Sequence, residues 1–283
     1  MTNDYGNLEL HKVLLSAMKD VDLICREHGL KYYLHAGTLL GALNHQGFIP
    51  WDDDVDISLF REDYEKLLEI ITEDYSDRYF VQNNKTESVF SHNRSVLRIL
   101  GTRVIHNGEE LEQHTEIGID LVPLDSAPDS KLARWWQQHV ILFWDMVTQI
   151  KLGIIIPSSI ITRTLSLFAK MDRKRLGERI DKECMKYNKK QTKYVGLLSY
   201  TGKNPYTGKS GYENDLLLRE WFENPIYVPF EDAEFMTISE PEKDLIHRYG
   251  PHWHDPYPEE KRVTKHEVKA YMINEEVRKR VGL

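Results

Sequence analysis

Residues 34–64, LHAGTLLGALNHQGFIPWDDDVDISLFREDY, decide how the fold is interpreted, because a glycine turn and an acidic cluster stand close together in them. The cluster WDDDVD at 51–56 places four carboxylates within five positions. Like charges at this density repel one another and raise one another's pKa unless a cation neutralises them. The stretch therefore predicts either a well-solvated acidic loop or a metal site.

The residues around the cluster favour the metal site. Residues 55–60 alternate between apolar and polar side chains, which is strand periodicity, and Pro50 and Trp51 argue against a flexible loop. On a strand over 54–59, Asp54 and Asp56 would lie on one face about 7 Å apart, a spacing that suits Mg²⁺ (or Mn²⁺). An EF-hand calcium loop is excluded, because Ile57 stands where that loop needs a glycine.

Asp120 is the candidate for a third metal ligand from a neighbouring strand. It stands among apolar residues in a predicted strand over 117–122, where a lone aspartate is costly without a partner. In an extended chain Asp52 would lie on the same face as Asp54, so it is expected to be an auxiliary ligand. Asp53 would lie on the opposite face and is expected to be structural or to face solvent. The predicted metal ligands are therefore Asp54, Asp56 and Asp120.

A phosphate-binding turn is predicted at Gly37 and Thr38. A short strand over 31–35 leads into the turn, and a helix is expected to follow from Leu39, so that backbone N–H groups at its start can bind an anion. Arg98, on a predicted strand over 95–105, is the candidate for stabilising charge on phosphoryl oxygens. The alternative for Arg98 is an ordinary salt bridge at a strand edge.

The order of strands and helices predicts an α/β (α+β) fold with three parts. Residues 1–128 are expected to form the core with a mixed sheet, residues 129–215 an added helical region, and residues 216–283 an aromatic, histidine-rich tail that packs back on the core. Helices are expected over 8–28, 61–73, 130–152 and 157–187 and near 239–249, and a further strand over 78–82.

Composition narrows the classes of partner. The net charge is −8, which disfavours nucleic acid, and the two cysteines lack the spacing of metal ligands. The first residues show no secretory signal and no run of 18 apolar residues occurs, so the protein is expected to be cytoplasmic. The aromatic segment 135–152 predicts buried helix packing or, as the alternative, a peripheral surface at the inner face of the membrane.

As a whole, residues 34–64 closely resemble the signature of the LicD family, which belongs to the nucleotidyltransferase superfamily and includes bacterial phosphorylcholine transferases and fukutin-related proteins. The superfamily pattern is a Gly-Ser/Thr turn, an Asp-x-Asp strand and a third carboxylate on a strand. These correspond here to Gly37 and Thr38, to Asp54 and Asp56, and to Asp120.

The resemblance continues beyond that stretch, in VLRILGT at 96–102, in IDLVPLDSAP at 119–128 and in the tail as far as His266. One departure is visible, because Asn44 stands where family members commonly carry an arginine before the histidine that corresponds to His45. If that arginine helps to hold a phosphate, another basic residue must do so in this chain.

The resemblance implies a nucleotidyltransferase-fold enzyme with a CDP-linked donor, first of all CDP-choline. Its phosphocholine unit would pass to a hydroxyl of a cell-surface glycan (a teichoic acid, capsule or lipopolysaccharide precursor) that is expected to be lipid-linked. Residues 1–128 would then be a nucleotidyltransferase-like catalytic core, and residues 129–215 would lie on the acceptor side. Asp54, Asp56, Asp120 and Arg98 would be catalytic, and the donor or cofactor would be bound by Gly37, Thr38, His35, Asp52 and His266.

Several alternatives stay open at this point. The donor could carry ethanolamine, ribitol or glycerol, and the reaction could be true nucleotidyl transfer that makes an NDP-alcohol. A catalytically inactive nucleotide-binding module is a third alternative, against which the intact set of acids argues. In the tail, Tyr249, Trp253 and Tyr257 are expected to be packing residues, or else an aromatic wall for a quaternary ammonium group.

Overall fold

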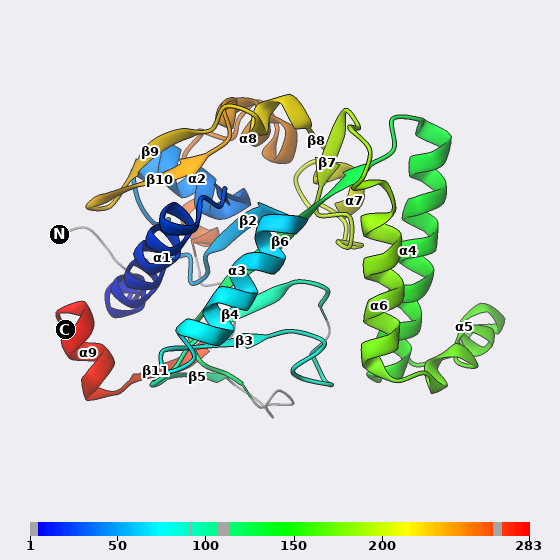
Figure 1. Cartoon of the computed structure of the whole chain (residues 1–283), viewed down its shortest axis with the longest axis horizontal. Coiled ribbons are helices and arrows are strands. Elements are labelled where there is room, and N and C mark those ends of the chain that lie inside the picture. Colours follow the sequence, from blue (N-terminus) through cyan, green and yellow to red (C-terminus); the bar gives the residue numbers. More distant parts are fainter. Residues whose placement is uncertain (1–4, 91, 107–113, 263–267) are drawn as a thin grey trace.

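The computed structural model describes residues 5–90, 92–106, 114–262 and 268–283 (Figure 1). At its centre lies a seven-stranded sheet with the order β1-β2-β6-β4-β3, to which β7 and β8 are added beside β6. Strands β2 and β6 are parallel, whereas β1 and β4 pair with them antiparallel, so the sheet is mixed and the predicted fold class is confirmed. The strands of the main path are β1 (Tyr33–Leu34), β2 (Asp56–Phe60), β3 (Tyr79–Gln82), β4 (Ser95–Ile99) and β6 (Gly118–Ala127).

The helices predicted at the start of the chain are confirmed. Helix α1 (Leu8–His28) buries an apolar stripe from Leu10 to Cys25. The helix ends at Gly29, whose φ of 65° is readily adopted by glycine. Helix α3 (Arg61–Asp74) follows β2 directly and buries Leu67 and Ile71 in the same core. Helix α2 (Ala36–His45) begins three residues earlier than expected.

Strand β6 is longer than the predicted 117–122. Its first part pairs with β2 and β4, and its last three residues pair with β7 (Tyr194–Gly196), which in turn pairs with β8 (Leu217–Leu218). The same strand therefore belongs to the catalytic core and also supports the beginning and end of the helical region.

In the helical region, α4 (Lys131–Lys151) agrees with the prediction, but the single helix expected over 157–187 is wrong. The chain forms α5 (Ile160–Leu165), a 3-10 turn (Phe168–Lys170), α6 (Arg173–Cys184) and a second 3-10 turn (Met185–Tyr187). Helices α5 and α6 each start at a side-chain cap: Ser159 accepts from the Thr162 N–H, and Asp172 accepts from the Arg175 N–H. Helices α4 and α6 pack side by side (Figure 1).

The strand expected over 95–105 is divided into β4 and β5 (Thr102–His106) by a turn at Gly101, whose φ is 85°. The tail contains the hairpin β9 (Ile226–Phe230) and β10 (Ala233–Thr237), then α8 (Pro241–Tyr249), β11 (Val268–Ile273) and α9 (Glu275–Val281). Phe230, Phe235 and Leu245 pack in the same core cluster as α1, so this part of the tail lies against the core. Short elements complete the chain at α7 (Gly211–Asn214), Arg219–Phe222 and Glu259–Lys261.

Candidate active site

The centre of the site is a pair of aspartates on the two parallel strands. Asp56 on β2 and Asp120 on β6 are register partners, so their side chains leave the same face of the sheet next to each other. Asp54 precedes β2, which begins at Asp56 and not at residue 54, and it lies in the loop that leads into the strand. Asp54 still lies close enough to Asp56 for its charge to raise the pKa of Asp56.

The loop before β2 brings three further carboxylates together. Oxygens of Asp52, Asp53 and Asp54 lie within 4.8 Å of one another, an arrangement that can hold a metal ion. Asp53 is half-buried and lines one cavity with Asp54 and Asp120, so it lies with the other acids and not apart from them. Strand alternation does not separate Asp53 from its neighbours here, because residues 52–54 form a loop.

The electrostatics of this cluster suit a cation. Burial raises the pKa of Asp56 well above its ordinary value, and the negative charges of Asp54 and then of Asp120 add to that effect. Arg94 offsets part of the charge, because its Nη2 lies 2.6 Å from Oδ2 of Asp120. One arginine cannot neutralise so many acids, and carboxylate oxygens are the ligands that Mg²⁺ takes. The residues present therefore fit a divalent metal ion.

A cavity of about 210 Å³ opens beside these acids and contains basic side chains as well. Arg98 on β4 lines it as predicted. Its Nε donates to Oε1 of Gln82 at 2.5 Å, and its Nη1 donates to the carbonyl oxygen of Glu116 at 2.8 Å. Arg98 is thus held in a fixed orientation at the wall of the acidic cavity.

Sequence reasoning missed two residues of this cavity, Arg94 and His92. A signal for Arg94 was present, because Arg94, Val96 and Arg98 are alternate residues and so share one face of the strand. Burial, and then the charge of Arg94, lower the pKa of His92 to about 4. The ring of His92 is therefore neutral at neutral pH and is a weak proton acceptor there.

Gly37 and Thr38 lie in the first turn of α2 and not in a turn before it, because the helix starts at Ala36. Oγ1 of Thr38 accepts a hydrogen bond of 2.8 Å from the N–H of Asp56, which joins the start of α2 to the start of β2. A Cβ atom at position 37 would lie 3.2 Å from Oδ2 of Asp52. Glycine at this position therefore allows the carboxylate of Asp52 to approach the helix closely.

The structure places His35 in a buried ion network directly before α2. Its Nε2 lies 3.4 Å from Oδ1 of Asp215, which also binds Arg248, and Arg248 donates from Nε to Asp244 at 2.6 Å. His35 thus joins the residue before α2 to the buried ion pair of Asp215 and Arg248. His266, the other histidine expected at the site, lies outside the described residues.

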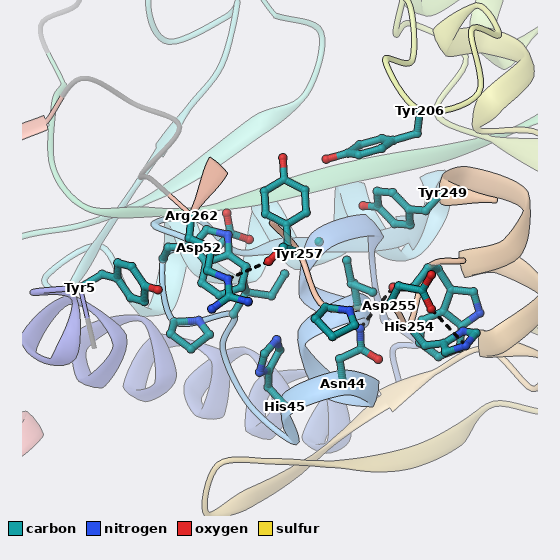
Figure 2. A pocket seen from close by; sticks show the side chains of 17 residues that line it. Tyr5, Asn44, His45, Asp52, Tyr206, Tyr249, His254, Asp255, Tyr257 and Arg262 are labelled. Carbon is teal, nitrogen blue, oxygen red and sulfur yellow. Dashed lines mark hydrogen bonds and ion pairs between the residues drawn. The ribbon is translucent and has the colours of Figure 1, made fainter. Parts of the chain in front are cut away.

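A larger pocket, of about 690 Å³, is lined by Asp52 of the acidic loop and by Gly37 of α2 (Figure 2). Trp51 stacks on Tyr257 with 5.9 Å between ring centroids, and the guanidinium of Arg262 lies 5.3 Å from the Trp51 ring. The remaining aromatic side chains of its wall are Tyr5, Tyr206, Tyr249 and Trp253.

The tail aromatics thus line a pocket, although packing was the expected role. Tyr249 and Trp253 do both, because each also packs against the main core. No local pattern could have paired Trp51 with Tyr257 and Arg262, since about two hundred residues separate them in the sequence.

Comparison with known proteins agrees with this geometry. Over 273 residues the chain is 22% identical to the lipopolysaccharide cholinephosphotransferase LicD of Haemophilus influenzae, covering 94% of this chain and 97% of that protein. The human ribitol 5-phosphate transferase FKRP is 51% identical over 35 residues, which are 12% of this chain and 7% of that protein. An uncharacterized protein of Rickettsia typhi is 39% identical over 72 residues, 25% of this chain and 23% of that protein.

Residues 29–141 match the family model described as the LicD/FKTN/FKRP nucleotidyltransferase domain. This range contains the start of α2, the acidic loop, β2, β4 and β6, and hence every acid of the cluster described above. Residues 29–141, with the whole acid cluster, are therefore similar to the nucleotidyltransferase domain of the LicD family, as the resemblance of residues 34–64 predicted.

Proposed function

We propose that this protein transfers a phospho-alcohol, first of all phosphocholine from CDP-choline, to a hydroxyl of a cell-surface glycan. The observation that supports the proposal most directly is that carboxylates and arginines occupy one site: Asp54, Asp56 and Asp120 lie together with Arg94 and Arg98. The acids suit a divalent metal ion, and the arginines suit phosphate oxygens. The printed activities of two relatives, cholinephosphate and ribitol 5-phosphate transfer, have a phospho-alcohol in common.

Asp54, Asp56 and Asp120 would hold Mg²⁺ (or Mn²⁺), with Asp52 and Asp53 beside them. When bound, the metal ion neutralises charge on the phosphate oxygens and favours deprotonation of a hydroxyl. Arg94 and Arg98, which line the same cavity as Asp54 and Asp120, would bind the phosphoryl oxygens.

The larger pocket is proposed to receive the donor. Its wall offers the stacked pair Trp51 and Tyr257, on which a planar base or an alkylammonium group can lie. Arg262 adds a positive charge at the same place, which suits the donor diphosphate. Gly37 and Asp52 line the pocket and also adjoin the acidic cluster, so a donor held here reaches the reacting site.

A third cavity, of about 290 Å³, is proposed to receive the acceptor. It shares His92 and Arg94 with the acidic cavity, and it adds the polar side chains of Asp145, Gln149 and Thr201 from the helical region. Thr201 and Gln149 both donate to Oδ2 of Asp145, which leaves a polar surface suited to sugar or polyol hydroxyls.

The direct test is incubation of the protein with Mg²⁺ and a panel of CDP-alcohols, with released CMP as the readout. We expect the fastest release from CDP-choline. Release from CDP-ribitol or CDP-glycerol alone would change the assigned headgroup. Formation of pyrophosphate from a nucleoside triphosphate and an alcohol phosphate, without CMP release from any CDP-alcohol, would instead establish nucleotidyl transfer and refute the proposal.

Replacing Arg98 with alanine is expected to lower turnover by about a hundred-fold, and replacing it with lysine by much less. Lysine keeps the positive charge in the cavity although it cannot make both hydrogen bonds to Gln82 and Glu116. Turnover numbers of both variants at saturating donor check this. If Arg98→Ala turns over like the unmodified protein, Arg98 is only a structural residue.

Replacing Trp51 with alanine is expected to raise the donor KM by about ten-fold while metal affinity stays unchanged. The side chain contributes a stacking surface to the larger pocket but no ligand to the acidic cluster. Steady-state kinetics with CDP-choline and titration with Mn²⁺ separate the two effects. A KM that does not move would exclude this pocket as the donor site.

A further inference from the structure

The segment that joins α4 to α6 exposes more apolar side chains than an ordinary surface does. Ile156, Ile160 and Ile161 are 81%, 84% and 69% exposed, and Ile154, Leu167 and Phe168 are exposed beside them. Scattered apolar residues are normal on protein surfaces, but six within fifteen consecutive residues are not. We name residues 154–168 the isoleucine corner; it contains α5 and lies at the outer edge of the molecule in Figure 1.

The charge around the isoleucine corner differs from that of the chain. Residues 151–175 contain six basic residues and one acidic residue, whereas the whole chain has a net charge of −8. Five of the six basic side chains are exposed: Lys151, Arg163, Lys170, Lys174 and Arg175. Protruding apolar side chains among exposed cations are complementary to an anionic lipid surface, where the former enter the acyl boundary and the latter meet the headgroups.

The isoleucine corner is also continuous with the cavity proposed for the acceptor, because Ile154 lines that cavity together with Asp145 and Arg94. A bilayer in contact with the corner would therefore lie beside the opening through which an acceptor reaches the site. We propose that the isoleucine corner docks this protein peripherally on an anionic membrane. The docking itself is a binding event, and its test does not depend on the proposed activity.

The sequence placed a possible membrane contact at Trp135 and Trp136 instead. Both side chains are exposed, at 51% and 60%, so the expectation that this whole segment is buried packing is wrong for them, although Ile141 and Val147 of the same helix are buried. The two tryptophans lie near the first residue of α4 and the isoleucine corner follows its last residue, so the two surfaces are separated by most of a 21-residue helix. This separation allows one experiment to distinguish them.

The experiment is co-sedimentation of the full chain with vesicles of phosphatidylcholine alone or mixed with phosphatidylglycerol. We expect binding to the mixed vesicles and at least about ten-fold less to phosphatidylcholine alone. The variant Ile156→Ser/Ile160→Ser/Ile161→Ser should lower binding to mixed vesicles by about ten-fold or more, and Arg163→Glu/Lys170→Glu should weaken it as well. Because these side chains are exposed, the variants should unfold at the same temperature as the unmodified protein.

Leu23→Ser on α1 is the matched control, since Leu23 is 53% exposed but lies outside the corner, and it should bind like the unmodified protein. Three results would overturn the proposal: no binding of the unmodified protein, an equal loss in the Leu23 control, or loss only in Trp135→Ala/Trp136→Ala. Self-association without vesicles that the isoleucine variant abolishes would also overturn it, because the corner would then join two copies of the chain.

Discussion

Replacement of Asp56 by alanine is expected to lower phospho-alcohol transfer by at least about a thousand-fold. The same loss is expected for Asp54→Ala and Asp120→Ala, because the three carboxylates are proposed to hold one metal centre together. Asp56 and Asp120 are register partners on parallel strands, so removal of either leaves its neighbour without the opposing ligand. CMP release and Mn²⁺ affinity should fall in parallel, and retained activity in Asp120→Ala would exclude it as a ligand.

Asp56→Asn separates catalysis from folding. The pKa of Asp56 is raised in the folded protein, so between its unfolded and folded values the folded state binds more protons. The free energy of unfolding therefore falls as pH rises through that window, and the charged side chain destabilises the metal-free protein at neutral pH. The asparagine variant should be inactive but at least as stable as the unmodified protein at neutral pH in thermal unfolding without metal. Reduced stability would mean that the carboxylate is structural.

Replacement of Arg248 by methionine is expected to reduce the free energy of unfolding by about 3–5 kcal/mol. Arg248 is buried and binds two buried acids, Asp215 and Asp244. Burial alone would raise the pKa of Asp215, but Arg248 and then His35 outweigh it and lower that pKa to about 2. The stability that Asp215 contributes is thus present above its unfolded pKa and is lost as pH falls through about 2.

Chemical denaturation of Arg248→Met at neutral pH measures the loss. Arg278→Met is the matched control, because Arg278 forms a salt bridge of 2.8 Å with Glu9 at the surface and should cost no more than about 1 kcal/mol. Equal effects in the two variants would show that the buried network adds no special stability. Since His35 belongs to the network and begins α2, we also expect a raised donor KM in the Arg248 variant.

The acidic pair could be predicted from the sequence because its signals are local. Asp56 and Asp120 each stand in an apolar strand pattern, and a buried carboxylate requires a partner. The orientation of Asp53 could not be predicted, because alternation between two faces applies to strands and the chain at 52–54 is a loop. Whether Asp54, Asp56 and Asp120 together bind the metal stays a prediction.

Other features depend on contacts that no local pattern reports. Helices α5 and α6 start separately at the caps of Ser159 and Asp172, which apolar periodicity does not reveal. The larger pocket forms only because the tail returns to α2 and places Tyr257 on Trp51. The boundaries near residues 128 and 215 likewise stay predictions, although β6 ends at Ala127.

The pairing of β6 with β7 has a consequence for how such enzymes diversify. Ala127 and Tyr194 are register partners, so the chain leaves the sheet after one and returns at the other, at neighbouring points. The residues between them, with α4, α5 and α6, form an insertion whose two ends are held next to each other; we call it the excursion. We therefore expect that a relative's excursion with the same end spacing can replace this one while β6 and Asp120 keep their place, provided that the contacts of Arg173 with Phe90 and His92 are kept.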